Sequence, residues 1–235
     1  MIELDVTSGD SVAHAFESIA KLGPVEALVN NAGVGVGGPI EFNDERSVLE
    51  AFDVNLLGYH RMARAVLPSM RKRREGLIVS VSSQLGRIVV PNIGVYCATK
   101  FGVEAMFEAL AYELAPFGVE VTIVQPGGYP TKIWENGRRL ADAVTARADE
   151  ERKAAYAGHN QMAQGLMNGQ YETDPMDVPR AIAEILALPP GKRPLRRPVH
   201  PNTQGSSAAN AAMAQIEAGV LSSGPYKDWH AAVVD

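Results

Sequence analysis

Hydrophobic positions along the chain fall into two kinds of run. Short continuous apolar runs lie at 25–29, 77–81 and 119–124, and such runs are typical of parallel strands that are buried on both faces. Between them, apolar residues recur at helical spacing over 43–74 and 96–114. Strands that alternate with long helices predict βαβ units, and therefore an α/β fold built on a parallel sheet.

The pattern weakens towards both ends of the chain. Residues 2–6 alternate enough to predict a short strand that begins almost at the first residue, and polar residues after it can cap a helix. Residues 129–173 are helical but irregular, and 194–200 predict a last strand. Without repeats or a linker, we expect one domain over residues 1–200 that includes this helical segment, followed by a C-terminal tail at 201–235.

The composition limits the classes of function. The 235 residues include 22 basic and 27 acidic side chains, and this net charge of −5 argues against a general nucleic-acid binder. Four basic residues at 71–74 fit the dipole of the helix that they end better than they fit a nucleic-acid or lipid contact. No apolar run approaches the roughly 20 residues that cross a bilayer. The single cysteine, Cys97, excludes an internal disulfide and a cysteine-cluster metal site, so we expect a cytoplasmic setting. His159 and His200 have no partner at ligand spacing, so we expect no metal.

Tyr96 and Lys100 are the first candidates for chemistry. They lie four residues apart at the start of a predicted helix, so both side chains project from one face. One such pair is weak evidence, because chance alone gives roughly 0.2 pairs in a chain of this composition. A phenol, whose ordinary pKa is about 10, becomes an acid/base at neutral pH when a nearby cation favours the phenolate. Lys100 suits that role, and Ser83, at the end of one strand, can polarise a carbonyl or hydroxyl oxygen.

These residues belong to a series of motifs. In chain order they are Asn30-Asn31-Ala32-Gly33, Asn55, Ser83 thirteen residues before Tyr96, Tyr96-Cys97-Ala98-Thr99-Lys100, and Pro126-Gly127 followed by Thr131. From about residue 2 to residue 190, their order and spacing resemble the short-chain dehydrogenase/reductase family. The resemblance implies a Rossmann-like, doubly wound parallel sheet and an oxidoreductase that uses NAD or NADP, without indicating which of the two.

The resemblance also implies a role for each matching residue. Tyr96 would be the catalytic acid/base, Ser83 would orient the substrate oxygen, and Lys100 would lower the pKa of the tyrosine and bind the nicotinamide ribose. Asn55 would hold a water relay to Lys100. The implied cofactor contacts are Asp5 and Val6 at the adenine, Asn30, Ala32 and Gly33 at the adenosine-side turn, and Pro126, Gly127 and Thr131 at the nicotinamide, together with Tyr96 and Lys100.

Three of these residues also have purely structural explanations. Asn55 fits a hydrogen-bonded asparagine inside a helix, Thr131 fits a helix cap, and Asp5 fits a turn. The sequence leaves both readings open for each of them.

A glycine-rich stretch at 33–38 matches the dinucleotide fingerprint G-x-G-x-x-G, and Asp53 follows about twenty residues after its start. In a working fingerprint the glycine turn runs directly into a helix, whose N-terminal amides bind the pyrophosphate. Here residues 39–42 separate the glycines from the first helix cap at Asn43. We therefore interpret 33–38 as a loop.

The glycine-rich loop that the family places after its first strand has no counterpart in this sequence. Residues 2–6 resemble the family's third strand, so a βαβ unit and a further helix, roughly 50 residues or more, would precede them. Without that portion the apolar strand at 25–29 becomes an exposed edge, which is an aggregation hazard. We expect the functional chain to begin upstream of Met1, and a stop codon directly before Met1 would contradict this.

Three functions are compatible with these residues. The first is an NAD(P)-dependent oxidoreductase that interconverts a secondary alcohol and a ketone, with Tyr96 moving the proton. The second is a truncated, non-catalytic remnant that acts as a binding module, and the third is a related epimerase or dehydratase. The substrate would be a small molecule. The resemblance implies that the two long helices, at 44–70 and 96–114, pack against their copies in a homo-oligomer, at least a dimer. We expect residues 129–173 to form a helical lid over the substrate site. Contact with an apolar substrate and packing in the core of this lid would explain Tyr129, Trp134, Met162, Met167 and Tyr171 equally well.

Overall fold

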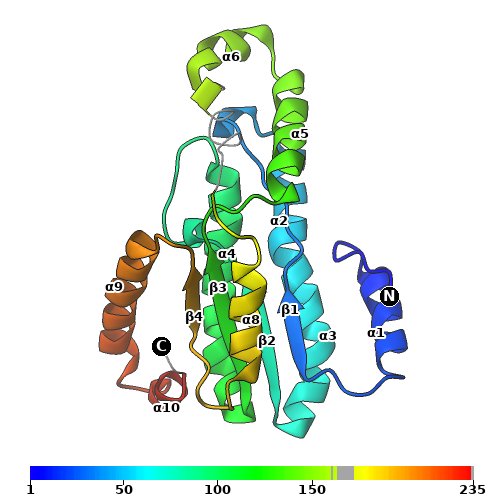
Figure 1. Ribbon diagram of the computed structural model, residues 1–235, viewed down its shortest axis with the longest axis vertical. Coiled ribbons are helices and arrows are strands. Elements are labelled where there is room, and N and C mark those ends of the chain that lie inside the picture. The colour runs from blue at the N-terminus through cyan, green and yellow to red at the C-terminus, as the bar shows by residue number, and fades with distance from the viewer. Residues whose placement is uncertain (160, 163–171, 234–235) are drawn as a thin grey trace.

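The fold is known from a computed structural model that describes residues 1–159, 161–162 and 172–233. Within those residues, four parallel strands form one sheet in the order β1-β2-β3-β4 (Figure 1). The pairing register aligns Leu77 with Ala27 on one side and with Glu120 on the other. The predicted α/β fold is confirmed, and the strands are β1 (Ala27–Asn30), β2 (Gly76–Val81), β3 (Val119–Pro126) and β4 (Arg196–Val199).

Helices connect and flank these strands. The segments before β3 are α1 (Gly9–Ile19), α2 (Glu45–Phe52), α3 (Gly58–Arg73) and α4 (Gly94–Leu114), with short 3-10 turns at Ile40–Phe42, Gln84–Gly86 and Ala115–Phe117. After β3 come α5 (Lys132–Arg147), α6 (Glu150–Ala155), α8 (Asp177–Ala187), α9 (Gln204–Leu221) and α10 (Lys227–Ala231).

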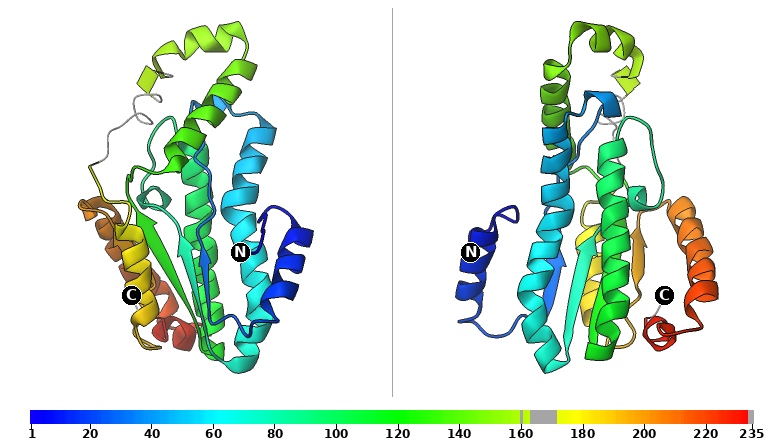
Figure 2. Two further views of the ribbon diagram at one scale, coloured as in Figure 1. Left: turned by 45° about the vertical axis from the view of Figure 1, so that its right-hand side comes forward. Right: turned by 180° about the vertical axis from the view of Figure 1, so that it is seen from behind.

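The sheet is covered on both faces. The helices α3 and α4 lie on one face and α8 lies on the other, as the front and rear views show (Figure 1 and Figure 2). Because side chains alternate along a strand, Ile78 packs with α3 and α4, whereas Leu77 and Val79 pack with α8. Every residue of β2 is buried, which is the burial that its continuous apolar run predicts.

The long helix predicted over 43–74 is present, but its winding changes midway. Asp44 caps α2 by accepting a hydrogen bond from the Ser47 amide, and α2 leads into a π-helical turn at Asp53–Leu57 before α3 begins. At the C-terminal end, Arg73 and Arg74 donate to backbone carbonyls of other segments. These bonds give part of the basic run a structural role.

The prediction of a strand at 2–6 is wrong. Residues 1–5 are exposed and pair with no strand among the described residues. A single strand has no hydrogen-bonded ladder of its own, so this segment forms a turn and lies against α3 instead. Val6 packs closely on Gly58, and the guanidinium of Arg61 donates to the Val6 carbonyl at 3.1 Å.

The remaining helices extend the molecule at two places. The helices α5 and α6 rise beyond the carboxyl ends of the strands (Figure 1), and α9 lies beside β4. The C-terminal tail at 201–235 contains α9, a helix of 18 residues. Over the described part of the chain, no helix combines the length and the apolarity needed to cross a membrane.

Candidate active site

The predicted catalytic residues gather at the carboxyl edge of the sheet. Ser83 follows the end of β2, and Pro126 ends β3. Tyr96 and Lys100 lie near the start of α4, which runs back along the sheet from this edge (Figure 2). The topology therefore places a strand end and a helix start beside each other, which is where α/β sheets bind their ligands.

Ser83 is held in place by its own hydroxyl. Its Oγ accepts a hydrogen bond from the Leu85 amide at 3.1 Å and lies 3.4 Å from the Pro126 carbonyl, to which it donates. A side-chain hydrogen bond also joins Ser83 to Tyr96. The strand β2 and the helix α4 thus bring together the two hydroxyls that the sequence paired.

The phenol of Tyr96 is protonated at neutral pH in this structure. Burial raises the pKa of Tyr96 to about 12, although the hydrogen bond with Ser83 acts in the opposite direction. Lys100 is not among the groups that shift this pKa. The lowering of the Tyr96 pKa by Lys100, which the family resemblance implies, stays a prediction.

The amine of Lys100 points to the end of β2 instead. Its side chain is only 3% exposed, and Nζ donates to the Val81 carbonyl at 2.8 Å. Nζ also lies 5.8 Å from the centroid of the Tyr96 ring and 5.5 Å from that of Tyr59. Burial lowers the pKa of Lys100 to about 8, and the charge of Glu104 opposes this by favouring the ammonium form.

Asn55 lies in the π-helical turn and is fully buried. Its Oδ1 accepts from the Val34 amide at 2.8 Å, and its Nδ2 donates to the Val34 carbonyl at 2.9 Å and to Oγ1 of Thr99 at 3.0 Å. Both amide hydrogens are thereby used within the protein. Asn55 therefore has the hydrogen bonds that its purely structural explanation predicts. Its part in a water relay stays a prediction.

The loop after β1 comes close to Lys100 at Gly33. A side chain begun at Gly33 would lie 3.4 Å from Oδ1 of Asn55 and 3.9 Å from Nζ of Lys100. The absence of a side chain therefore leaves space directly beside the lysine. The stretch 33–38 leads to a short 3-10 turn and not into an α-helix, which confirms its interpretation as a loop.

Neighbouring residues of the predicted cofactor set lie in different surroundings. Asn30 is buried and donates to Oγ of Ser80 at 3.3 Å, whereas Ala32 is exposed. Gly127 is hydrogen-bonded to the end of β4: its amide donates to the Val199 carbonyl at 3.0 Å. Thr131 precedes α5 at the cap position, but its side chain makes no capping hydrogen bond.

Asp5 and Val6 are occupied by local contacts. Oδ1 of Asp5 accepts from both the amide and the hydroxyl of Thr7, at 2.9 and 2.7 Å. This is the turn that the structural reading of Asp5 predicts. Val6 lies against α3, so neither residue stands at the end of a strand as the resemblance implied.

The aromatic residues that suggested an apolar pocket are mostly packed. Tyr129 belongs to the core between the sheet and α8, and Trp134 donates from Nε1 to the Tyr129 carbonyl at 2.6 Å. Met162 is exposed, and Met167 and Tyr171 lie outside the described residues. The packing of Tyr129 and Trp134 favours the lid-core reading for these two side chains.

The sequence reasoning missed several residues that support the site. Ser82 lies beside the backbone of α4, with its Oγ 3.5 Å from the Lys100 carbonyl, and Thr99 accepts from Asn55. Glu104 is buried one turn after Lys100. The spacing of four residues between Lys100 and Glu104 was the available signal, since it places both on one helix face.

Comparisons with known proteins show which family the chain is similar to. A family model described as short chain dehydrogenase matches residues 1–141. A 3-ketodihydrosphingosine reductase of Bacteroides thetaiotaomicron is 43% identical over 150 residues, which are 63% of this chain and 55% of that protein. Retinol dehydrogenase 8 of Bos taurus is 36% identical over 198 residues, which are 83% of this chain and 62% of that protein. The chain therefore spans less than two thirds of the length of both relatives.

A solved structure shows the same fold. A short chain dehydrogenase/reductase from Burkholderia phymatum, in complex with NAD, is 26% identical with a TM-score of 0.71, and the match covers 94% of this chain and 77% of that one. Because the family model also matches more than half of its residues, the chain belongs to the short-chain dehydrogenase/reductase family.

Proposed function

We propose that the protein is an NAD(P)-dependent oxidoreductase that interconverts a secondary alcohol and a ketone. The observation that carries the proposal is the hydrogen bond between Ser83 and Tyr96, with the buried Lys100 amine 5.8 Å from the centroid of the Tyr96 ring. Two hydroxyls in contact can both bond to one substrate oxygen, and one of them can also transfer a proton to it.

In the direction of reduction, Tyr96 donates the proton. A pKa of about 12 keeps its phenol protonated at neutral pH, so the acid form is available. Ser83 holds the carbonyl oxygen of the substrate, while Lys100 places a positive charge 5.8 Å from the centroid of the Tyr96 ring. In the direction of oxidation the same residues act in reverse, and Tyr96 must first lose its proton.

NAD or NADP would supply the hydride acceptor or donor. The nicotinamide end of such a cofactor would lie beside Gly33 and Lys100, and Lys100 would hold a ribose hydroxyl. Asn30, Ala32, Pro126, Gly127 and Thr131 are proposed as further contacts. Asp5 and Val6 are proposed only as neighbours of the adenine, because their own polar groups are used locally.

An apolar alcohol or ketone is the proposed substrate class. The names of both reported relatives denote a reaction at a carbonyl or hydroxyl of a large apolar molecule. The helices α5 and α6 lie beyond the carboxyl ends of the strands, and we propose residues 129–173 as the cover of the substrate site.

A homodimer through the long helices is also proposed. Large apolar side chains remain exposed on this helical surface, among them Leu49 at 60% and Phe101 at 39%. Contact between two copies would remove them from water, which favours association.

The proposal is tested with the purified 235-residue chain. NADH and NADPH are titrated against the intrinsic tryptophan fluorescence, and turnover is measured on long-chain and polycyclic ketones. Tyr96→Phe should bind the cofactor normally but lose roughly 10²- to 10⁴-fold in turnover, the range of general acid catalysis. Tyr226→Phe, at an exposed tyrosine on the far tail, is the matched control and should keep full activity.

Three results would overturn the proposal in different ways. Absence of saturable binding of either cofactor would favour the non-catalytic binding module. Turnover without net oxidation of the cofactor would indicate an epimerase or dehydratase. Unchanged turnover in Tyr96→Phe would remove Tyr96 as the acid/base.

A further inference from the structure

Glu104 is a buried carboxylate next to the catalytic helix start. It lies four residues after Lys100 on α4, and only 1% of its surface is exposed. A buried charge is costly unless it is paired. Glu104 meets this requirement with three donors from three segments of the chain: Nε2 of Gln125 at 2.9 Å, Nε of Arg196 at 3.0 Å and Nε of Arg87 at 3.4 Å.

These contacts reach the loop that carries Ser83. Arg87 lies just four residues after Ser83, and the turn Gln84–Gly86 lies between them. A methyl group at Gly86 would be 2.9 Å from Cγ of Glu104 and 2.7 Å from Oγ of Ser82, so the loop packs tightly on this side chain. Glu104 thus contacts the loop in two ways: its Cγ packs on Gly86, and its carboxylate pairs with Arg87.

We propose that Glu104 is a positioning residue, whose buried carboxylate holds the loop 82–87 with Ser83 against the helix with Tyr96 and Lys100. The proposal rests on the proposed oxidoreductase function, because only that function gives these three residues a shared task. Glu104 itself touches neither substrate nor cofactor. It acts through the loop backbone and through its charge.

The charge of Glu104 acts on Lys100. Burial lowers the pKa of Lys100, and Glu104 is the group that opposes this effect. The other groups that face Lys100 are the phenols of Tyr59 and Tyr96, which are neutral at pH 7. Loss of the carboxylate charge should therefore leave the ammonium form of Lys100 less favoured.

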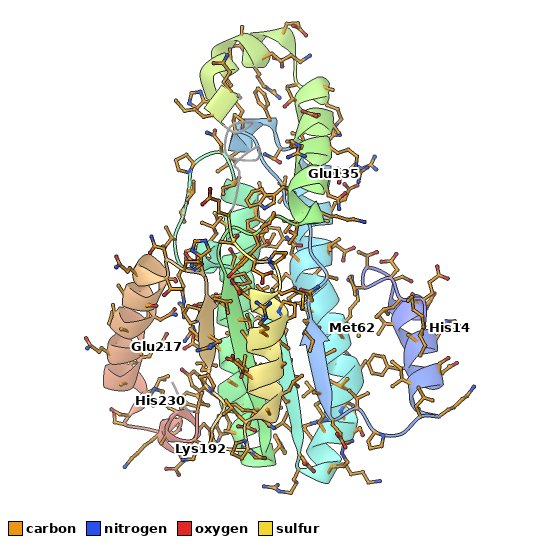
Figure 3. All side chains as sticks on the ribbon, viewed as in Figure 1. His14, Met62, Glu135, Lys192, Glu217 and His230 are labelled. Atoms are coloured by element: carbon orange, nitrogen blue, oxygen red, sulfur yellow. The ribbon has the colours of Figure 1, made fainter. Side chains whose placement is uncertain are left out.

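The surroundings of Glu104 supply a matched control. Glu108 lies one turn further along α4 and pairs with the same two arginines, Arg196 and Arg87, and with Glu217 on α9, which Figure 3 labels. Glu108 is not among the groups that shift the pKa of Lys100. Glu104→Gln and Glu108→Gln therefore remove the same charge from the same ionic cluster, at different distances from the catalytic lysine.

The first measurement is independent of activity. The pKa of Lys100 is followed by NMR of ¹³C-lysine-labelled protein, with the Lys100 signal identified as the one that Lys100→Met removes. Glu104→Gln should lower this pKa by about one pH unit, at the low end of the effect of a close opposite charge, and Glu108→Gln should leave it unchanged. Equal pKa values in wild type and Glu104→Gln would overturn the charge effect.

The second measurement is the split between kcat and KM. Glu104→Gln should lower kcat about tenfold with little change in KM, as expected when reacting groups are misplaced and binding is kept. Gly86→Ala displaces the same loop without removing a charge, so it should lower kcat while the Lys100 pKa stays at its wild-type value. Equal losses of kcat in Glu104→Gln and Glu108→Gln would show a merely structural role and overturn the proposal.

These outcomes separate the two proposals. A wild-type protein without turnover would refute the proposed oxidoreductase function, and with it the shared task of the three residues. A wild-type protein with turnover, but with normal kcat in both Glu104→Gln and Gly86→Ala, would refute only the role of Glu104. Circular dichroism of each variant excludes unfolding as the cause of a loss.

Discussion

Asn55 and Val34 exchange two hydrogen bonds, one in each direction, between the side-chain amide of Asn55 and the backbone of Val34. Two residues on neighbouring antiparallel strands exchange hydrogen bonds in the same way, but here the two bonds join a helical turn to a loop. It fixes the loop after β1 next to Lys100, at the point where Gly33 leaves space. The side chain that the family resemblance assigned to a water relay therefore also shapes the loop.

Asn55→Asp should destabilise the fold and loosen this loop. The substitution removes the donor to Val34 and Thr99 and buries a new charge, so we expect a loss of about 1–3 kcal/mol in the free energy of unfolding. Urea unfolding measures it, and cofactor titration should show weaker binding. Asn136→Asp, at an exposed position on α5, is the control and should change neither quantity. Equal stability of the two variants would contradict the role of the Asn55 amide.

The pH dependence of turnover should differ between the two directions of the reaction. Because the pKa of Tyr96 is about 12, its phenol is protonated from pH 6 to 8, and the reduction rate should be nearly constant over that range. Oxidation needs the phenolate, whose fraction rises up to about tenfold per pH unit below the pKa. The oxidation rate should therefore rise with pH until Lys100 loses its proton near its own pKa of about 8. An oxidation rate that is flat from pH 6 to 8 would contradict this assignment.

Docking of α9 should weaken as the pH rises through neutrality. Burial, and then a hydrogen bond with Glu108, raise the pKa of Glu217 to about 7, against an ordinary value of 4.5. A raised pKa contributes stability that is fully present below the unfolded-state value and is lost as the pH rises through the folded-state value. The pKa of Glu108 is lowered, so its own contribution is lost only at acidic pH.

Hydrogen exchange can test this effect on α9 directly. The amides of α9 should exchange faster at pH 8 than at pH 5.5, after correction for the intrinsic pH dependence of exchange. Glu217→Gln keeps the hydrogen bond without a titrating group, so it should remove most of the difference. The charges of Arg196 and Arg87 also face Glu217 and remain in both proteins. A difference that persists in Glu217→Gln would assign the effect to another group.

Gly118→Ala should cost more stability than Gly191→Ala. Both glycines have positive φ, 67° and 79°, so both substitutions carry the strain of the left-handed region, roughly 1–2 kcal/mol. At Gly118 the new methyl would also lie 2.6 Å from the Arg74 carbonyl oxygen, whereas nothing lies within 4 Å at Gly191. The difference between the two free energies of unfolding isolates the steric clash. Equal values would show that the Arg74 backbone yields without cost.

Substitution of an exposed leucine should reveal the dimer. Leu49→Glu places a charge on the helical surface that we propose as the interface, so sedimentation velocity should show a shift from dimer to monomer. Leu22→Glu, at a leucine that is more exposed and lies outside that surface, should sediment like the wild type. A wild-type protein that is monomeric at micromolar concentration would contradict the proposed homodimer.

The sequence predicted most of the sheet and the core of the site. Continuous apolar runs identified β1, β2 and β3 because a strand buried on both faces has no polar side. The spacing of Tyr96 and Lys100 placed both on one helix face, and the structure brings Ser83 to the same place. The local sequence pattern was sufficient to predict the position of a side chain wherever a single helix or strand determines that position.

Other features depend on contacts that no local pattern contains. The alternation at 2–6 predicts a strand, but a strand forms only with a partner, and none pairs with it among the described residues. The direction of the Lys100 amine depends on the Val81 carbonyl, which lies on another element. The ionic contacts of Glu104 likewise come from segments that are distant in the sequence, since Arg196 follows it by 92 residues.

The π-helical turn at Asp53–Leu57 has a consequence for how the chain can vary. A π-helical turn holds more residues than an α-helical one, so α2 and α3 are out of phase with each other. Deleting one residue here would restore uniform winding and rotate α2 by about 100° relative to α3. Ala51, which packs with Val36 and Val95, would then face away from its neighbours. Homologous chains should therefore conserve the length of this helix even where its side chains differ.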